Sequence, residues 1–464
     1  MERPIAWKSY DQNTKDEVFA FAEAYRKFIS KCKTERECVT EFKRLAKQAG
    51  FIDLQEVIDK GTRLHPGDRV FADNHGKMLA FFIIGRESIE HGMNILGAHI
   101  DSPRLDLKPN PLYEDTGMAM LDTHYYGGIK KYQWVTLPLA IHGVVAKKDG
   151  SVVTLSIGED PEDPVIGISD LLIHLSAEQL EKKGAKVVEG ESLDALVGTI
   201  PLISKEDDKE IKDPVKANIL ALLKNKYDFE EEDFLSAEIE IVPAGPARDY
   251  GIDRSMIMGY GHDDRCCAYP SFAAMLEVSA PRKTSVCLLV DKEEIGCVGP
   301  TGMESRFFEN ITAELMNACG DYSEFKLRRA LQNSKALSSD VNAAFDPNYP
   351  AVMEKKNAAF FGRGLVFSKY TGSRGKVCSN DADAEYVALM RKIMDNANVF
   401  FQMAELGKVD AGGGGSIAYM LGNYNMSVID SGVAVLNMHA PWEIICKADL
   451  YEAKKGYIAF LLNA

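Results

Sequence analysis

Short apolar runs that end abruptly in charged residues recur along this chain of 464 residues. The most regular run spans residues 286–290 and is followed by Asp291 and then by the pair Glu293 and Glu294. An apolar run without alternating polar positions predicts a strand that is covered on both faces, as in a parallel sheet flanked by helices. Because ligands of such sheets gather at the carboxyl ends of the strands, the two glutamates mark a candidate site.

Two further strand-like segments also run into residues that can bind a metal. Residues 94–98 lead into His99, with Asp101 two positions later, and residues 432–437 lead toward His439. A histidine that binds a metal usually donates its second ring N–H to a carboxylate, and Asp101 is well spaced to accept it from His99. A single histidine at a strand end is more often structural, so the interpretation depends on the whole set.

The remaining pattern divides the chain into an α/β part and a β-rich part. Capping boxes predict helices that begin at Thr14 and Thr34. Helix signals then become sparse over about 140 residues, where strand patterns with turn signals dominate. The sequence thus predicts an α/β fold in which residues 1–104 and 248–464 form one domain, with a mixed central sheet flanked by helices. A β-rich domain at residues 105–247 interrupts it.

Composition narrows the classes of partner. Hydrophobic residues make up 46% of the chain and charged residues 27%, as in ordinary globular proteins. The formal net charge of −15 argues against nucleic acid or an anionic membrane as a partner, because both require a basic surface. Nine scattered cysteines form no Cys-x-x-Cys pair, and the start of the chain has no apolar leader, so we expect a cytoplasmic protein.

The candidate residues share one chemistry, that of a metal site. Two imidazoles and three carboxylates, with no thiolate, suit Zn²⁺, Co²⁺ or Mn²⁺. Five ligands exceed the need of one tetrahedral ion, but they fit two ions that share a bridging carboxylate and a water of lowered pKa. A further carboxylate must stay off the metals to transfer a proton, and the doubled glutamates supply it. The five ligands are His99, Asp264, Glu294, Asp340 and His439.

These motifs resemble the M18 aminopeptidases, the aspartyl-aminopeptidase family of the MH clan. The similarity extends from about residue 15 to the C-terminal end, with all metal motifs in the family order. It is carried by His99-Ile-Asp101-Ser-Pro-Arg, Asp263-Asp264-Arg, Asp291-Lys-Glu293-Glu294-Ile-Gly, Ser339-Asp340-Val-Asn and Met438-His439.

The resemblance implies a dinuclear metal-dependent aminopeptidase. Such an enzyme removes N-terminal residues, acidic or neutral, from peptides with a free N-terminus by attack of a metal-bridging hydroxide. By resemblance, Asp264 bridges two divalent ions, of which Zn²⁺ is the first choice. His99 and Asp340 then hold one ion, and Glu294 and His439 hold the other.

Three more residues receive roles by the same resemblance. Glu293 would be the general base, and Asp101 would orient His99. His174 lies in a stretch similar to the family segment whose histidine reaches the active site of a neighbouring subunit. The inserted domain is therefore expected to form a lid and to drive homo-oligomerisation, to a dodecamer built from dimers.

Alternatives stay open at this point. Carboxypeptidases or amide deacylases of the same clan share the metal chemistry, and substrates with a free amine or a free carboxylate distinguish them. A non-enzymatic scaffold or cargo protein could keep a vestigial site, although the intact Glu293 argues against it. The preferred N-terminal residue is open too, because family members selective for acidic residues use a basic side chain that could correspond to Lys369, Arg374 or Lys376.

Overall fold

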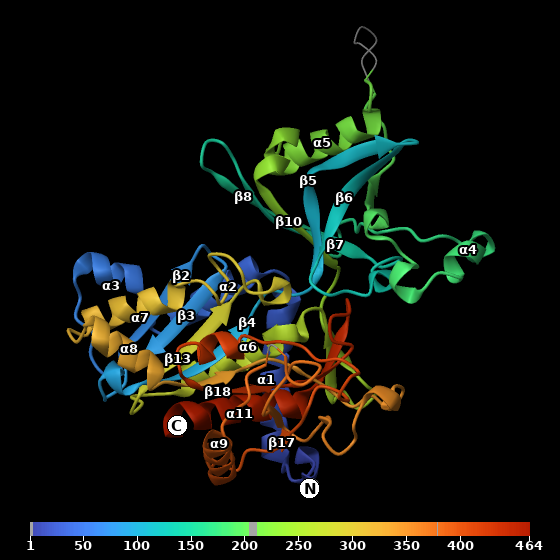
Figure 1. Cartoon of the computed structure of the whole chain (residues 1–464). Helices are drawn as coiled ribbons and strands as arrows, with labels where there is room; N and C mark the ends of the chain where they lie inside the picture. The colour runs from blue at the N-terminus through green and yellow to red at the C-terminus, as the bar shows by residue number, and fades with distance from the viewer. Residues whose placement is uncertain (1–2, 204–210, 378) are drawn as a thin grey trace. The chain divides into compact units, whose positions relative to one another are not determined.

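The computed structural model describes residues 3–203, 211–377 and 379–464, and it has the predicted mixed α/β fold (Figure 1). Its internal contacts divide the chain into two compact units. The first unit consists of Met1–Asp101, Ala247–Met438 and Glu443–Ala464. The second consists of Ser102–Pro246 and His439–Trp442.

The first unit is built on a nine-stranded mixed sheet. β13 pairs in parallel with β4 and antiparallel with β3, and β14 pairs in parallel with both β4 and β18. Across the sheet, the strands follow the order β1 (Ile52–Asp53), β2 (Arg69–Asn74), β3 (Met78–Ile83), β13 (Thr284–Val290), β4 (Met93–His99), β14 (Lys335–Ser338), β18 (Ser427–Gly432), β16 (Leu365–Ser368) and β17 (Phe401–Met403).

The central strand β13 is covered on both faces, as its unbroken apolar run predicts. Cys287 and Leu289 join one core cluster, whereas Val286, Leu288 and Val290 join another. Helices that contribute to the first cluster are α1 (Gln12–Lys31), α2 (Glu35–Gln48), α6 (His262–Glu277), α9 (Ala384–Asn396) and α11 (Lys447–Asn463). Helices that contribute to the second are α3 (Leu54–Lys60), α7 (Phe307–Ala318), α8 (Glu324–Gln332) and α10 (Ala418–Gly422).

A smaller five-stranded sheet in the same unit positions the start of α6. Its strand order is β11 (Arg248–Tyr250), β12 (Met256–Gly259), β20 (Glu443–Cys446), β19 (Ala434–Leu436) and β15 (Asn342–Ala343). β12 pairs antiparallel with β20, so that Gly259 lies opposite Glu443. The chain leaves β12 through Gly261, whose φ of 76° is left-handed, and enters α6 directly.

The second unit is β-rich and contains a six-stranded antiparallel sheet. Its strand order is β8 (Val152–Ile157), β7 (Leu139–Ala146), β10 (Ala237–Pro243), β5 (Arg104–Asp115), β6 (Met118–Tyr126) and β9 (Ala195–Gly198). Two helices accompany the sheet, the short α4 (Ala177–Leu180) and the longer α5 (Pro214–Tyr227).

Two local predictions differ from the structure. The first helix begins at Gln12 with Asp11 as its N-cap, whose carboxylate accepts the N–H of Thr14, so the predicted cap at Thr14 is wrong. The capping box at Thr34 and Glu37 is confirmed. α5 was not predicted, although Pro214 at its first turn is a typical start signal.

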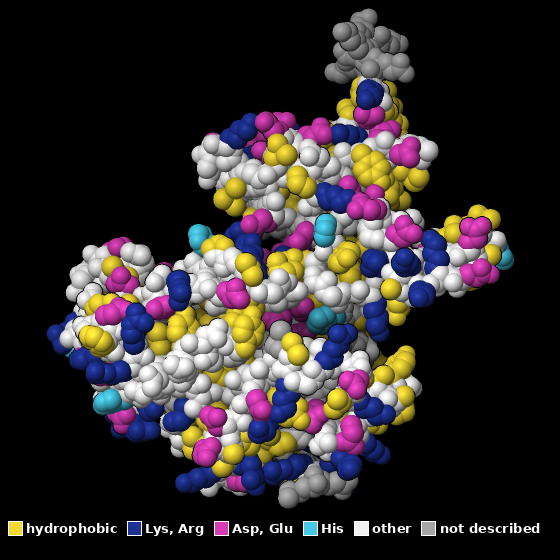
Figure 2. All heavy atoms as spheres, in the orientation of Figure 1, with side chains coloured by type: hydrophobic (Ala, Val, Ile, Leu, Met, Phe, Trp, Pro, Cys, Tyr) yellow, Lys and Arg dark blue, Asp and Glu magenta, His cyan; other side chains and the backbone are white. Residues whose placement is uncertain are grey.

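The surface shows no segregation of charge on the face in Figure 2, where acidic and basic side chains are interspersed. Among the described helices, none has the length and apolar character needed to cross a membrane.

Candidate metal centre

Three neighbouring parallel strands bring the candidate residues of the first unit together. His99 is the last residue of β4 and lies opposite Val290, the last residue of β13. Glu293 and Glu294 follow β13 in a short 3-10 turn, and Asp340 follows the end of β14 by two residues. The carboxyl ends of these strands meet at one edge of the sheet, which is where open α/β sheets place their ligands.

His99 lies at the middle of this group. Its Nε2 lies 3.1 Å from Oδ1 of Asp263 and 3.8 Å from Oε2 of Glu293. One candidate ligand atom each from His99, Asp263 and Asp340 lie within 4.8 Å of one another. The same holds for His99, Glu293 and Glu294, and a carboxylate oxygen of Asp263 also lies within 4.8 Å of one of Glu294.

Asp101 fixes the orientation of the residues around it. Nδ1 of His99 lies 3.1 Å from the carbonyl oxygen of Asp101 and 3.3 Å from its Oδ1. Since both are acceptors, Nδ1 carries the proton, and Nε2 is the nitrogen available to a metal. The carboxylate of Asp101 also accepts the backbone N–H groups of Glu293 and Glu294, each at 3.2 Å.

The turn after β13 explains how two consecutive glutamates reach one site. Lys292 has a φ of 67° and Gly296 has a φ of 97°, so left-handed residues bracket the turn. A regular strand would place Glu293 and Glu294 on opposite faces. The irregular turn that lets both glutamates converge is therefore present. The buried carboxylate of Asp101 fixes it by accepting the two backbone N–H groups.

At the start of α6, two consecutive aspartates are candidates, and they lie differently with respect to His99. Asp263, and not Asp264, joins the groups of potential ligands around His99. The carboxylate of Asp264 instead lies 3.3 Å from the backbone nitrogen of His99 and accepts its N–H. The backbone N–H of Asp263 donates to Oε2 of the buried Glu443 at 3.0 Å, which fixes the peptide that carries this carboxylate. The sequence analysis named Asp263 only as part of the motif Asp263-Asp264-Arg and assigned no role to it or to Glu443.

The two remaining predicted residues belong to the second unit. His439 lies half-buried, and its Nδ1 donates to the carbonyl oxygen of Gly128 at 2.9 Å, which leaves Nε2 as the candidate ligand atom. His174 lies exposed in the 3-10 turn Ile173–Leu175. Its two neighbours in that turn are exposed apolar residues.

Comparisons with known proteins agree with this geometry. The family described as aminopeptidase I zinc metalloprotease (M18) matches residues 28–461. The chain belongs to the M18 aminopeptidase family. The predicted resemblance is thereby confirmed, and the chain is a peptidase of the hydrolase class.

Several relatives cover nearly the whole chain. A probable M18 family aminopeptidase 1 of Clostridium acetobutylicum is 62% identical over 458 residues, 99% of this chain and 98% of the relative. A crystal structure of aminopeptidase I from that organism has a TM-score of 0.92 at 60% identity, covering 99% of each chain. That of an M18 aminopeptidase from Thermotoga maritima has a TM-score of 0.94 at 44% identity, covering 100% of each. A dodecamer of yeast mApe1 shares the fold, with a TM-score of 0.75 at 20% identity and 97% coverage of each chain.

The donor set fits the zinc that characterises the M18 family. Imidazole nitrogen and carboxylate oxygen are both ordinary zinc ligands, and Nε2 of His99 is turned toward the carboxylates. Among the described residues, the groups that could hold an ion all include His99 or Asp263. These two side chains are the first candidates to bind the metal of this metal-dependent aminopeptidase.

The electrostatics of the site also favour a bound cation. Burial opposes protonation of His99, but Asp101 and Asp263 outweigh it and raise the pKa of His99 well above its ordinary value. Burial raises the pKa of Asp264 well above its ordinary value, and burial together with Glu293 does the same for Asp340. Raised pKa values mean that these groups bind a proton more tightly in the folded chain than in an unfolded one, because carboxylates this close repel each other, and a divalent cation can take the place of such protons.

This cluster predicts how stability depends on pH without metal. Since the pKa of Asp340 is higher in the folded than in the unfolded chain, its protonation stabilises the folded state. That contribution is complete below the ordinary pKa of about 4 and is lost as pH rises through the folded-state value. We expect the melting temperature of chelator-treated protein to fall more steeply with rising pH than that of chelator-treated Asp340→Asn. Parallel curves would show that the Asp340 carboxyl holds no such proton.

Proposed function

We propose that this M18 aminopeptidase uses two divalent metal ions, with Asp263 as the shared ligand. The supporting observation is that a carboxylate oxygen of Asp263 lies within 4.8 Å of candidate ligand atoms of His99 and Asp340. A carboxylate oxygen of Asp263 also lies within 4.8 Å of one of Glu294. His99 and Asp340 would hold one ion. Glu294 and His439 would hold the other. Zn²⁺ is the first choice, and the same donors accept Co²⁺ or Mn²⁺.

In this proposal Glu293 is the general base. Bound divalent ions would lower the pKa of a coordinated water and polarise the scissile carbonyl group. The carboxylate of Glu293 would accept the proton of the attacking water and return it to the departing amine. Asp101 prepares Glu293 for this role, because it holds the backbone of the turn and the ring of His99 at once.

A basic loop in the first unit is the candidate determinant of side-chain preference. Tyr370, Arg374 and Lys376, together with Glu405, line a cavity of about 170 Å³. Both Lys369 and Lys376 contact one carboxylate, that of Asp381, at 2.6 and 2.8 Å. Arg374 is exposed and forms no ion pair with any described residue.

The glycines at residues 412–415 connect this loop to the strands that carry the site. The N–H of Gly372 donates to the carbonyl of Gly414 at 2.6 Å, and a Cβ on Gly413 would lie 1.6 Å from the carbonyl oxygen of Gly372. Ser416, directly after these glycines, lies 3.3 Å from the hydroxyl of Ser338, the last residue of β14. The basic loop is therefore connected to β14, the strand that precedes Asp340, through the hydrogen bond of Gly372 with Gly414 and that of Ser416 with Ser338.

We further propose that the chain functions as a homo-oligomer in the cytoplasm, a dodecamer built from dimers through the second unit. The dodecamer of yeast mApe1, which has the same fold, supports this. So does the exposed apolar segment around His174, in which Ile173 is 68% and Leu175 69% exposed. Exposed apolar side chains that cluster in this way mark interaction surfaces. His174 would then donate a hydrogen bond to the reacting carbonyl in a neighbouring subunit.

The proposed roles of the two glutamates can be separated by mutation. Glu293→Gln should keep metal and fold but lower kcat by about 10²–10⁴-fold, because an amide cannot accept the proton. Glu294→Gln should lose bound metal as well. Hydrolysis of leucyl- and aspartyl-anilides, with metal analysis of the same samples, measures both effects. If Glu293→Gln lost metal and Glu294→Gln kept it, the roles would be reversed.

If the basic loop selects the N-terminal residue of the substrate, the variant Asp381→Asn should prefer acidic residues more strongly than the wild type does. Removing this carboxylate leaves the charges of Lys369 and Lys376 uncompensated, so the ratio of kcat/KM for aspartyl- over leucyl-anilide should rise, and Arg374→Ala should lower it. Glu354→Gln, which changes a carboxylate on an exposed loop, is the matched control. An unchanged ratio in both loop variants would exclude this loop from substrate selection.

The proposal that His174 acts in the active site of a neighbouring subunit can be tested by mixing two inactive variants. Glu293→Gln and His174→Ala subunits should each be nearly inactive, since one hydrogen-bond donor to the reacting oxygen contributes about 10²–10³-fold in rate. Mixed oligomers reassembled from both should regain activity, because some sites then combine the intact halves of two chains. Mixed oligomers verified by mass spectrometry that stay inactive would contradict the exchange.

A further inference from the structure

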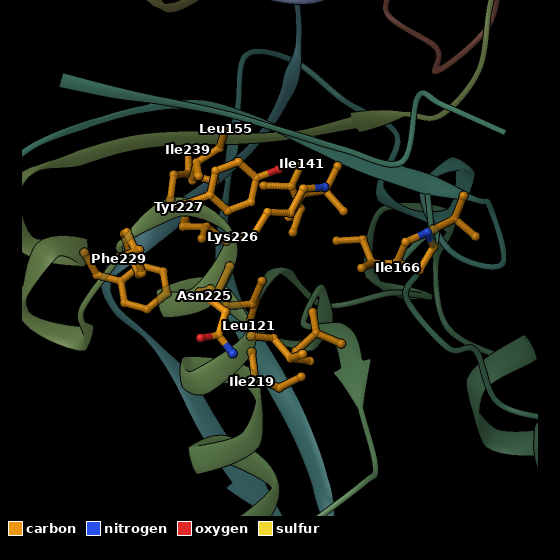
Figure 3. A pocket seen from close by; sticks show the side chains of 18 residues that line it. Leu121, Ile141, Leu155, Ile166, Ile219, Asn225, Lys226, Tyr227, Phe229 and Ile239 are labelled. Atoms are coloured by element: carbon orange, nitrogen blue, oxygen red, sulfur yellow. The ribbon is translucent and has the colours of Figure 1, made fainter. Parts of the chain in front are cut away.

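The second unit contains a large apolar cavity between its sheet and α5 (Figure 3). The cavity has a volume of about 510 Å³. Each of the six strands contributes at least one apolar side chain to it, namely Leu155 and Ile157 of β8, Ile141 of β7, Ile239 of β10, Leu107 of β5, Leu121 of β6 and Val197 of β9. The volume lies within the range of about 300–1,000 Å³ that is common for small-molecule sites.

Helix α5 lines the cavity opposite the sheet and covers it loosely. Ile219, Leu222 and Leu223 of the helix line the space, as do Phe229 and Phe234, which follow the helix in the sequence. In Figure 3 the side chains of Leu121 and Ile219 approach from the sheet and the helix respectively. The space is partly open to solvent, since Val165 and Leu222 of its lining are exposed, and an apolar occupant would therefore cover apolar surface and be stabilised by the hydrophobic effect.

The polar side chains that line the cavity are few and come from three consecutive residues, Asn225, Lys226 and Tyr227. The hydroxyl of Tyr227 donates to the carbonyl oxygen of Ser156 at 2.9 Å, so this group is already satisfied. Among the described residues that line the cavity, Lys226 is the one cation, and none is a carboxylate. The side chain of Lys226 is 54% exposed, and its Nζ lies 3.4 Å from Oδ1 of Asp163 and 5.2 Å from the ring of Tyr227.

We propose that this cavity binds a long-chain carboxylate. Its alkyl chain would lie between the six-stranded sheet and α5, where all the strand residues that line the cavity are apolar and Asn225 is the one side-chain amide among the described lining residues. Its carboxylate would lie at the edge and pair with Lys226, which can turn from its long contact with Asp163 toward the ligand. The space lies between a sheet and the helix of the same unit, so a narrow flexible chain fits it better than the surface of a folded partner.

The test is equilibrium binding to the full-length chain. Hexadecanoate should displace a fluorescent eighteen-carbon polyene carboxylate with a stoichiometry of one per chain, and hexadecanol should bind more weakly. Ile219→Trp, which fills the cavity, should abolish binding of both compounds. Leu223→Phe serves as a second filling variant if Ile219→Trp does not fold, as judged by its thermal melt.

The position of the carboxylate is tested by one pair of lysines. Lys226→Ala should weaken hexadecanoate binding about twofold to fivefold, because a partly exposed ion pair contributes modestly, and should leave hexadecanol binding unchanged. Lys224→Ala is the matched control, since Lys224 lies on the same helix but does not line the cavity. The proposal is wrong if no saturable binding occurs, if the filling variants bind normally, or if acid and alcohol bind equally well. A filling variant that changes the oligomeric state and not lipid binding would assign the cavity to a second copy of the chain.

Discussion

Carboxylate repulsion at the end of three parallel strands is the constraint on which the site of this protein depends. Asp263, Glu293, Glu294 and Asp340 meet around His99, where ionised carboxylates cannot all coexist without cations or protons between them. Burial strengthens the effect, because charge is poorly screened there. The fold must therefore hold these groups in place until metal binds, and its means of doing so is hydrogen bonding to fixed backbone positions.

Asp101 and Glu443 provide most of that fixation. The carbonyl oxygen of Asp101 accepts the ring N–H of His99, and its buried carboxylate, which also lies near that nitrogen, accepts the backbone N–H groups of both glutamates, so this one residue orients three others. Glu443 accepts the N–H of Asp263 from a neighbouring sheet. Neither needs to touch a substrate. Mutation of residues that orient metal ligands in this way typically costs about 10–100-fold in metal affinity or activity.

The sequence allowed much of this to be predicted, since strands covered on both faces have an unmistakable pattern. The apolar run at residues 286–290 placed β13 and the corner behind it, and the spacing of His99 and Asp101 indicated a ligand with its orienting carboxylate. The choice between Asp263 and Asp264 could not be made in this way. Two consecutive residues differ only in the direction of their side chains, which the backbone at the start of α6 decides.

The second unit was harder to anticipate. Helix α5 covers its sheet loosely, and only Val215 among its residues is buried, so the helix lacks the strong apolar stripe that sequence patterns detect. The apolar cavity beneath it arises from side chains of six strands that are distant in sequence. Such a site emerges from tertiary structure alone, whereas a metal site is visible through its unusual ligand residues.

Metal content per chain tests the central claim, a dinuclear site that shares Asp263, most directly. After saturation with Zn²⁺ and removal of excess metal, the wild-type chain should retain two ions. Asp263→Ala should retain neither at ordinary affinity, because both would lose a ligand, whereas Asp264→Ala should retain at least one. One ion in the fully active wild-type protein, or loss of both ions in Asp264→Ala with retention in Asp263→Ala, would contradict the account.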